Sequence, residues 1–325
     1  MAGPDDVIDA AELALLAEAF RKTMSSASGQ VLDIALSALG WRDLLAEMPG
    51  TAIPMVFRLL GETGAHAPLL NDVLLTAAGR EAGGTLPLPY AGSAWVIWDR
   101  TDQPSVTIDG EIPLRRLPAA HPADAAAGPA SYASPANSAS PASAGGTAAA
   151  DAGAPDGALA AGAAALAAGR RAVGWWLLGS GRAMLALARA HAVDRMQFGR
   201  PIASFQAVRH RLADTLVALD GAEAVLTAAG EQAADEQVAE PGHGAGDVAL
   251  ASLLAKAAAG QAALTAARHC QQVLGGIGFT AEHALHIHVK RVLVLDGLLG
   301  STRELTREAG RRLIATGAAP RLVDL

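Results

Sequence analysis

Apolar residues recur at three- to four-residue spacing along most of this chain, which is the pattern of amphipathic α-helices. Glycines separate the first of these segments from one another. The helices predicted in this part are AELALLAEAFRK and residues 31–39, 41–47, 53–60 and 67–78. Asp9 lies where it would cap the first of them. Residues 1–79 are therefore predicted to form an N-terminal helical domain.

The pattern changes between residues 80 and 117, where the composition is typical of strands. Ala94–Trp98 and residues 105–108 are short β-type runs in Pro-rich surroundings. Strands this few and this short cannot close a barrel, so this residual β-domain has to pack on a helix or on another chain. Residues 118–156 contain little besides Ala, Pro, Ser and Gly, which predicts a disordered linker.

Long helical patterns follow the linker, and short turns join them. The predicted helices cover residues 157–189, 204–232, 247–274, 282–299 and 302–314. The first is either continuous or broken near Gly174 or Gly179, and Ser204 and Asp247 are placed to cap the second and the third. Long helices joined by short turns predict an antiparallel bundle over residues 157–325, and a fold that is mainly α.

Composition and charge narrow the classes of function. Alanine supplies much of the 51% hydrophobic content and favours helices, whereas the net charge of −7 opposes general nucleic-acid binding. A single cysteine, Cys270, cannot form an intrachain disulfide. The acidic start lacks the apolar run of a secretory signal, and the apolar stretch 172–190 carries Arg182. We therefore expect a cytoplasmic protein without a membrane span.

The first segment with a chemical signal is RMQFGRPIASFQ, residues 195–206. The pattern predicts that one helix ends in Arg195–Gly199 and that another starts at Ser204 after a turn with Pro201. An arginine, an amide and a helix N-terminus together suit a phosphate or pyrophosphate. Taken alone, the segment suits a capped turn with a surface arginine better.

The second such segment is QQVLGGIGFTAEH, residues 271–283. Two adjacent glycines after a helix allow a ligand to approach the backbone, although a glycine C-cap explains them as well. The spacing differs from a dinucleotide fingerprint, and a helix precedes the glycines where a strand is required.

In this order, the two segments resemble the C-terminal bundle of the acyl-CoA dehydrogenase family. RMQFGRPIASFQ is similar to its R-x-x-F-G-x-x-I-x-x-F-Q stretch, and QQVLGGIGF to its Q-x-x-G-G-x-G-F stretch. The resemblance covers residues 159–315, and 5–79 more weakly. It implies an N-terminal helical domain, a middle β-barrel and a C-terminal four-helix bundle, in an oligomer that dehydrogenates acyl-CoA with FAD.

The resemblance also implies cofactor contacts, with Arg195 on the FAD pyrophosphate and residues 272–276 along the adenine end from a neighbouring subunit. The residues expected to contact or flank FAD are Arg195, Gln197, Phe198, Phe205, Gln206, Gln272, Gly275, Gly276, Ser301 and Arg303.

The chain departs from the family at the catalytic base, a glutamate that removes the α-proton of the thioester. Leu299 occupies one of the two positions at which relatives carry it, and Gly169 occupies the other. Asp296 is one helical turn from Leu299 and is a weak candidate for a displaced base, although a cap or a salt bridge suits it better. The β-domain is also shorter than the barrel of full-length family members. Trp95 and Trp98 are its only resemblance to the Trp-containing strand that covers the flavin in that family.

Several other residues suit structural roles. His283, His286 and His288 point to different faces of a helix and lack an acidic ligand, so no metal site is expected. Cys270 and the Trp175–Trp176 pair suit core packing.

Two functions remain open. The chain is either a self-sufficient flavin-dependent acyl-CoA dehydrogenase with a relocated base, or a base-lacking subunit that shares an FAD site with an intact paralogue. Mixed assemblies of some actinobacterial members support the second reading by analogy. A scaffold without flavin is a distant third.

Overall fold

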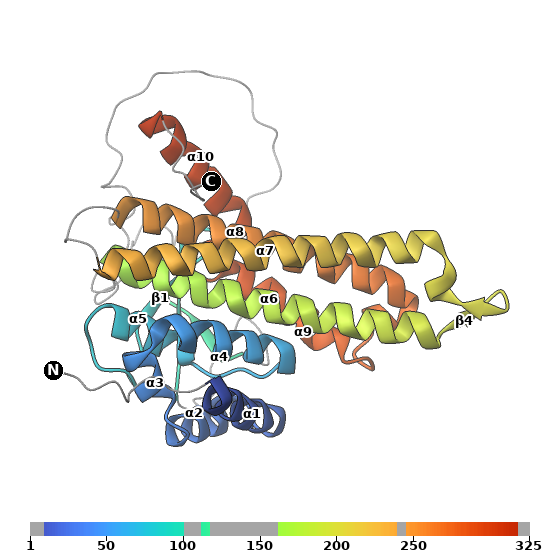
Figure 1. The fold of residues 1–325 in the computed structure, drawn as a ribbon, viewed down its shortest axis with the longest axis horizontal. Helices are drawn as coiled ribbons and strands as arrows, with labels where there is room; N and C mark the ends of the chain where they lie inside the picture. The colour runs from blue at the N-terminus through green and yellow to red at the C-terminus, as the bar shows by residue number, and fades with distance from the viewer. Residues whose placement is uncertain (1–9, 101–111, 118–161, 239–244, 318–325) are drawn as a thin grey trace, which may run out of the picture.

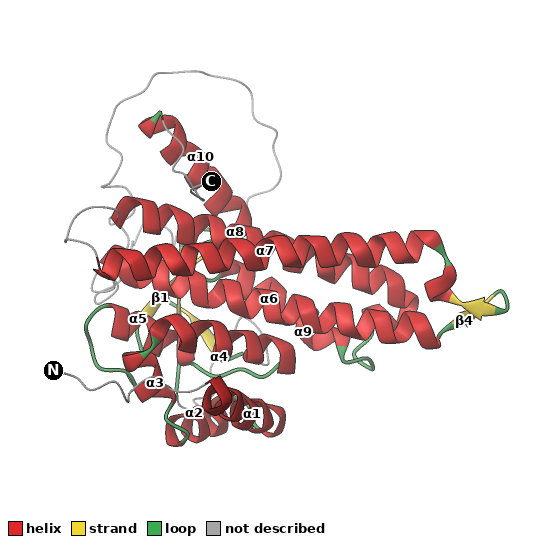
Figure 2. Ribbon diagram, in the orientation of Figure 1, coloured by secondary structure: helices red, strands yellow, loops and turns green. Residues whose placement is uncertain are grey.

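The computed structural model describes residues 10–100, 112–117, 162–238 and 245–317 (Figure 1). Asp9, the strand predicted at 105–108 and the linker predicted at 118–156 lie outside these residues, so those expectations stay predictions. In the described part the fold is mainly α: helices form an N-terminal layer and a long bundle, with a small sheet beside them (Figure 2).

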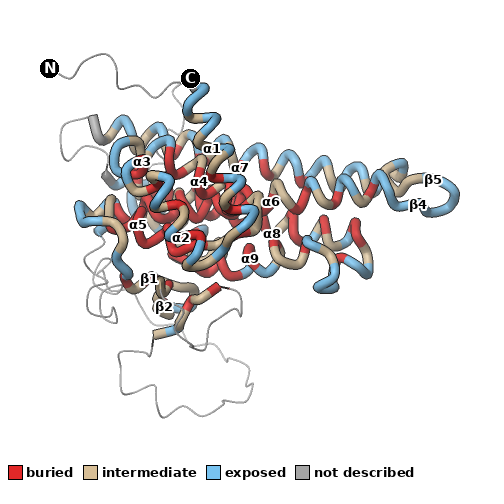
Figure 3. Tube along the Cα trace, turned by 90° about the horizontal axis from the view of Figure 1, so that it is seen from below, coloured by how far each residue is buried: buried red, intermediate tan, exposed pale blue. Residues whose placement is uncertain are grey.

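Five helices form the N-terminal layer, close to the predicted positions. They are α1 (Ala10–Ser26), α2 (Gly29–Ala38), α3 (Trp41–Glu47), α4 (Pro49–Thr63) and α5 (Leu69–Ala77). Proline at the start of α4 and the left-handed Gly64 (φ +72°) at its end explain its bounds. The buried faces of this layer join the core of the bundle without a break, and Figure 3 shows the most buried stretches where the two meet.

The small sheet has three antiparallel strands in sequence order, β1 (Pro87–Tyr90), β2 (Ala94–Trp98) and β3 (Leu114–Arg116). It packs on the bundle, as so short a sheet must. Trp98 of β2 stacks on Trp176 of the bundle, with ring centroids 5.5 Å apart. Both Trp side chains are fully buried, so this contact is part of the core.

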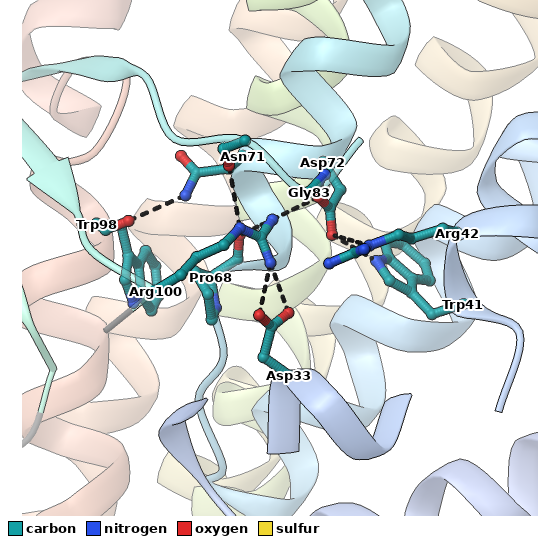
Figure 4. Close-up of polar contacts among 10 residues, drawn as sticks. Asp33, Trp41, Arg42, Pro68, Asn71, Asp72, Gly83, Trp98 and Arg100 are labelled. Atoms are coloured by element: carbon teal, nitrogen blue, oxygen red, sulfur yellow. Dashed lines mark hydrogen bonds and ion pairs between the residues drawn. The ribbon is translucent and has the colours of Figure 1, made fainter. Parts of the chain in front are cut away.

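Arg100, just after β2, ties the sheet to the N-terminal helices (Figure 4). Its guanidinium donates to both carboxylate oxygens of Asp33 at 2.6 Å, to Asp72, and to the Gly84 carbonyl at 3.0 Å. Asp72 also accepts bonds from Trp41 Nε1 at 3.1 Å and from Gly83 N at 2.7 Å. Burial raises the pKa of Asp72, while Arg100 opposes that rise. Arg100 and Asp72 therefore form a buried ion pair, in which removal of either charge would leave the other buried without its main partner.

The bundle consists of α6 (Gly162–Asp194), α7 (Gln206–Val238), α8 (Ala245–Leu274) and α9 (Leu285–Gly297), and α10 (Thr302–Thr316) lies against α8. The open question about α6 is resolved, because it is continuous through Gly174 and Gly179. Two predicted caps are wrong. The Ser204 hydroxyl bonds back to Pro201 O at 2.7 Å in a 3-10 turn (Ile202–Ser204), so α7 starts later, and Asp247 lies inside the first turn of α8.

Glycine in α6 allows the N-terminal layer to touch the bundle directly. A Cβ on Gly179 would lie 2.2 Å from the carbonyl oxygen of Arg58 in α4. A Cβ on Gly61 of α4 would lie 2.3 Å from the Trp176 carbonyl oxygen. The backbones of α4 and α6 are therefore in van der Waals contact, with no space between them for another molecule at this point.

Within the described residues, one helical stretch, Gly246–Phe279, is long and apolar enough to cross a membrane by length and composition alone. The sequence analysis had instead suggested 172–190 as the most apolar stretch. The most apolar window of Gly246–Phe279 is 67% buried inside the structure, which is typical of a core helix.

Candidate cofactor site

The segment after α6 forms a projecting hairpin at one end of the bundle. Strands β4 (Met196–Gln197) and β5 (Arg200–Pro201) pair antiparallel around a tip of Phe198 and Gly199, both left-handed at φ +52° and +74°. α6 ends at Asp194, one residue before the predicted helix end within Arg195–Gly199, and the segment after it is two short strands joined by a turn at Phe198 and Gly199. Arg195 and Gln197 are exposed on this hairpin.

The hairpin is ordered by contacts with Phe205, the residue before α7. The Phe198 ring meets the Phe205 ring edge-on at 6.2 Å, and the Arg200 guanidinium lies 4.3 Å from the centre of the same ring. Even so, Phe198 is 90% exposed. A left-handed, solvent-exposed phenylalanine is costly in an isolated chain, which points to a contact surface.

This end of the bundle is positively charged although the chain as a whole is acidic. Residues 189–214 carry five arginines against two aspartates, and the basic residues are Arg189, Arg195, Arg200, Arg209 and Arg211. The N-terminus of α7 adds the positive end of its helix dipole. Beside it lies a hollow of about 340 Å³, lined by Gln206, Arg209, His210 and Ala213. Exposed guanidinium groups next to a helix N-terminus are suited to a phosphate group.

The glycine pair lies at the same end of the bundle. Gly275 is left-handed (φ +64°) and ends α8, and a 3-10 turn (Gly275–Phe279) follows. A Cβ on Gly275 or Gly276 would meet nothing within 4 Å, and Gln272 is exposed beside them. His191 near the end of α6 meets His283 after the turn, with ring centroids 6.5 Å apart, which links the two segments in space. The pair thus offers open backbone next to the charged hairpin.

Ser301 and Arg303 lie elsewhere. The Ser301 hydroxyl and backbone N–H donate to Glu304 at 2.7 and 2.9 Å, and Glu304 N donates back to the hydroxyl at 3.4 Å, a capping box that starts α10. Thr302 packs on Gly260 of α8, fifteen residues before Gly275. At about 1.5 Å per residue this is roughly 22 Å along the helix. Within one chain, these two residues are therefore not brought together with the hairpin.

The two positions at which relatives carry the base meet in space. A Cβ on Gly169 in α6 would lie 2.8 Å from Leu299 Cδ1 and 2.8 Å from Leu74 Cδ2. Leu299 is only 1% exposed. The sequence places these positions 130 residues apart, and the structure brings them together as tight apolar packing. No space remains there for a carboxylate and a substrate carbon.

Asp296, the weak candidate for a displaced base, is engaged in holding α10. One of its oxygens accepts bonds from Thr302 N at 3.1 Å and from Thr302 Oγ1 at 2.5 Å. The expectation of a capping role for Asp296 is therefore the one that the contacts favour.

The contacts and burial of the histidines and the cysteine indicate structural roles. His288 is buried and bonds to the backbone of Gly61, and burial lowers its pKa to about 4. His283 Nδ1 accepts from Leu285 N at 3.1 Å. Burial raises the pKa of Cys270 to about 12, which leaves its thiol unreactive at neutral pH. In the described parts of the chain, no three His, Cys, Asp or Glu residues form a group that could hold a metal ion.

Sequence reasoning missed the polar contacts that fix the turn between α9 and α10. Arg170 Nε donates to Leu299 O at 3.3 Å, and Lys256 Nζ donates to Asp296 O at 3.0 Å and to Gly300 O at 2.5 Å. Both side chains are buried. The available signal was their setting in the sequence: Lys256 is the single charged residue of the apolar stretch 248–267, and Arg170 with its neighbour Arg171 interrupts another apolar stretch. A charge without a partner is costly in such surroundings.

These observations test whether the chain fits FAD. The hairpin, the α7 N-terminus and the open glycine pair fit the pyrophosphate and adenine end of a dinucleotide, because they combine exposed cations with accessible backbone. The region around Gly169 and Leu299 does not fit a flavin ring facing a substrate, because side chains fill it.

Comparison with known proteins identifies a family that the bundle matches. Residues 156–314 match the family model "Acyl-CoA dehydrogenase, C-terminal domain". Two curated relatives from Mycobacterium tuberculosis are similar: acyl-CoA dehydrogenase FadE34 (36% identical over 148 residues, 45% of this chain and 20% of the relative) and acyl-CoA dehydrogenase IpdE2 (38% over 130 residues, 40% and 36%). The matched part thus spans only about a fifth to a third of their length.

Two solved structures share the fold over almost the whole chain. The Tcur3481-Tcur3483 steroid ACAD has a TM-score of 0.60 at 18% identity, covering 95% of this chain and 99% of that one. The ChsE4-ChsE5 complex from Mycobacterium tuberculosis has a TM-score of 0.57 at 17% identity, covering 95% and 98%. The bundle of this chain, residues 156–314, therefore belongs to the C-terminal domain family of acyl-CoA dehydrogenases.

Proposed function

We propose that this chain is a base-lacking subunit of an FAD-linked acyl-CoA dehydrogenase assembly. The observation that carries the proposal is that Leu299 and Leu74 both pack on Gly169, where the side chains leave no room for a Cβ. Leucine and glycine side chains cannot take up a proton, and the general base contributes about 10²–10⁴-fold in rate. Direct contact between α4 and α6 also leaves no room for an acyl chain there.

In this proposal the hairpin end serves a shared FAD site, and a paralogue supplies the glutamate and the flavin-ring pocket. Arg195 would pair with the pyrophosphate, and Gln272 to Gly276 would line the adenine end. FAD would accept the β-hydride of the acyl-CoA thioester. Exposed apolar side chains support a partner at this end, and they are Val193, Met196, Phe198, Ile277 and Phe279. The fold is also like that of chains solved as the ChsE4-ChsE5 complex.

The test of the proposal is turnover of a panel of acyl-CoA thioesters with an artificial electron acceptor. We expect the purified chain to be inactive alone and active when co-expressed with a paralogue whose glutamate is intact. Robust turnover by the chain alone, abolished by Asp296→Ala, would overturn the proposal in favour of a self-sufficient enzyme with a relocated base. Absence of flavin from every assembly would favour a scaffold.

The role of Arg195 is tested in the same assembly. Arg195→Ala removes a charge-assisted contact, so we expect FAD affinity to fall by about 10- to 100-fold. Arg80→Ala is the matched control, because Arg80 is also exposed but follows α5, far from the hairpin (Figure 1). Equal flavin retention by the two variants would show that Arg195 does not contact the cofactor.

A further inference from the structure

The turn between α9 and α10, residues 296–301, has an unusual backbone. Leu299 and Gly300 are both left-handed, at φ +57° and +99°. A glycine adopts this region freely, whereas a leucine does so only when its surroundings impose it. The question is therefore which groups impose it.

One side of the turn is held by the small sheet. Leu299 N donates to Pro89 O at 2.8 Å, and Ala91 N donates to Gly297 O at 2.8 Å. These bonds fix the edge of the turn against β1. They leave the carbonyl groups of Asp296, Leu299 and Gly300 pointing toward the bundle, where α8 and α6 supply their partners.

Lys256 of α8 is the partner of two of these carbonyls. Its ammonium group is fully buried and reaches Asp296 O and Gly300 O, which lie on either side of Leu299. Asp296 O is also in the last turn of α9, where the helix dipole favours a cation. A single ammonium thus closes the turn across its strained residue.

The charged groups that face Lys256 come from three other elements. Arg170 on α6 opposes its charge, while Asp296 on α9 and Glu304 on α10 favour it. Burial outweighs these and lowers the pKa of Lys256 to about 7. A buried cation of this kind contributes little net stability, because desolvation cancels much of the gain from its bonds. The main effect of Lys256 is therefore on the conformation of the turn at residues 296–301.

We infer that Lys256 is the positioning residue of this turn, acting as a built-in cation that holds residues 296–301 in one conformation. The turn sets the place of side chain 299 against Gly169 and starts α10 at Ser301.

The test is hydrogen exchange on the full chain, read at the amides of Leu299 and Ser301. In Lys256→Met we expect these amides to exchange at least about tenfold faster, because the turn loses two bonds to a charged group. Amides in the middle of α8 should keep their protection. Lys22→Met is the matched control, since it removes an exposed lysine from α1 and should change nothing in the turn.

Lys256→Arg keeps the positive charge and should retain most of the protection. It also serves as the test if Lys256→Met fails to fold: loss of turn protection in a folded Lys256→Arg, or unchanged protection in a folded Lys256→Met, overturns the inference. The readout needs no flavin, so failure of the proposed function and failure of this inference are separate outcomes.

Discussion

The contact between α4 and α6 makes a sharp prediction about Gly179. In Gly179→Ala the new methyl group would lie 2.2 Å from the carbonyl oxygen of Arg58, more than 1 Å inside normal contact. The obstacle is backbone, so the two helices must separate. Overpacking costs about 1–3 kcal/mol, and a backbone obstacle places this variant at the upper end, near 3 kcal/mol. Alanine returns about 1 kcal/mol through its higher helix propensity.

We therefore expect Gly179→Ala to lower the free energy of unfolding by about 2 kcal/mol or more. Gly221→Ala is the matched control, because a Cβ on Gly221 in α7 meets nothing within 4 Å. It should raise stability by up to about 1 kcal/mol. Urea unfolding followed by circular dichroism measures both. If Gly179→Ala is as stable as Gly221→Ala, the two helices do not touch at this residue and the argument for a closed α4–α6 contact fails.

Two further predictions concern buried charge. Arg100→Met should lower the free energy of unfolding by about 3–5 kcal/mol in urea melts, because the buried carboxylates of Asp33 and Asp72 lose their nearest cation and Asp72 keeps only Arg42 at 3.9 Å. The half-exposed Arg115→Met should cost at most about 1 kcal/mol, and equal losses for the two variants would refute the role of Arg100 as a buried anchor. His288 should make stability pH-dependent: burial lowers its pKa to about 4 in the folded chain from an ordinary value of 6.5, so the unfolded chain binds more protons between these values. Stability present above pH 6.5 should fall by about 3 kcal/mol as the pH drops to 4, and unfolding curves of His288→Leu should lack that step.

The sequence was sufficient for most helices because their apolar spacing reports the buried face directly. It failed at the hairpin after α6. RMQFGRP contains no alternating pattern, and its two-residue strands are imposed by the packing of Phe198 and Arg200 around Phe205. Ser204 likewise had the residue type of a cap, but a 3-10 turn used its hydroxyl first. Local propensity cannot distinguish such competing partners.

The candidate site also has a part that the sequence predicts and a part that it does not. The two motifs identified the hairpin end, and the resemblance named Leu299 and Gly169, but nothing in the sequence alone places those two side chains in contact. That contact depends on how α6 and the α9–α10 turn pack, which is tertiary information. The contacts of Lys256 and Arg170 were missed for the same reason, since both side chains reach backbone carbonyls of a turn distant in sequence, and Arg170 also pairs with Glu308 at 3.6 Å.

In the proposed function, the absence of a base and the presence of cofactor contacts are compatible because they depend on different physical features. A base is one carboxylate that has to be buried near its substrate, and burial of an unpaired carboxylate is costly. Leu299 avoids that cost, because its buried apolar side chain packs on Gly169. The features proposed to bind phosphate at the hairpin end are instead a helix N-terminus, open glycine backbone and exposed arginines, none of which requires a buried carboxylate. A chain can therefore lose the first and keep the second, and the result is suited to serve a neighbour's chemistry.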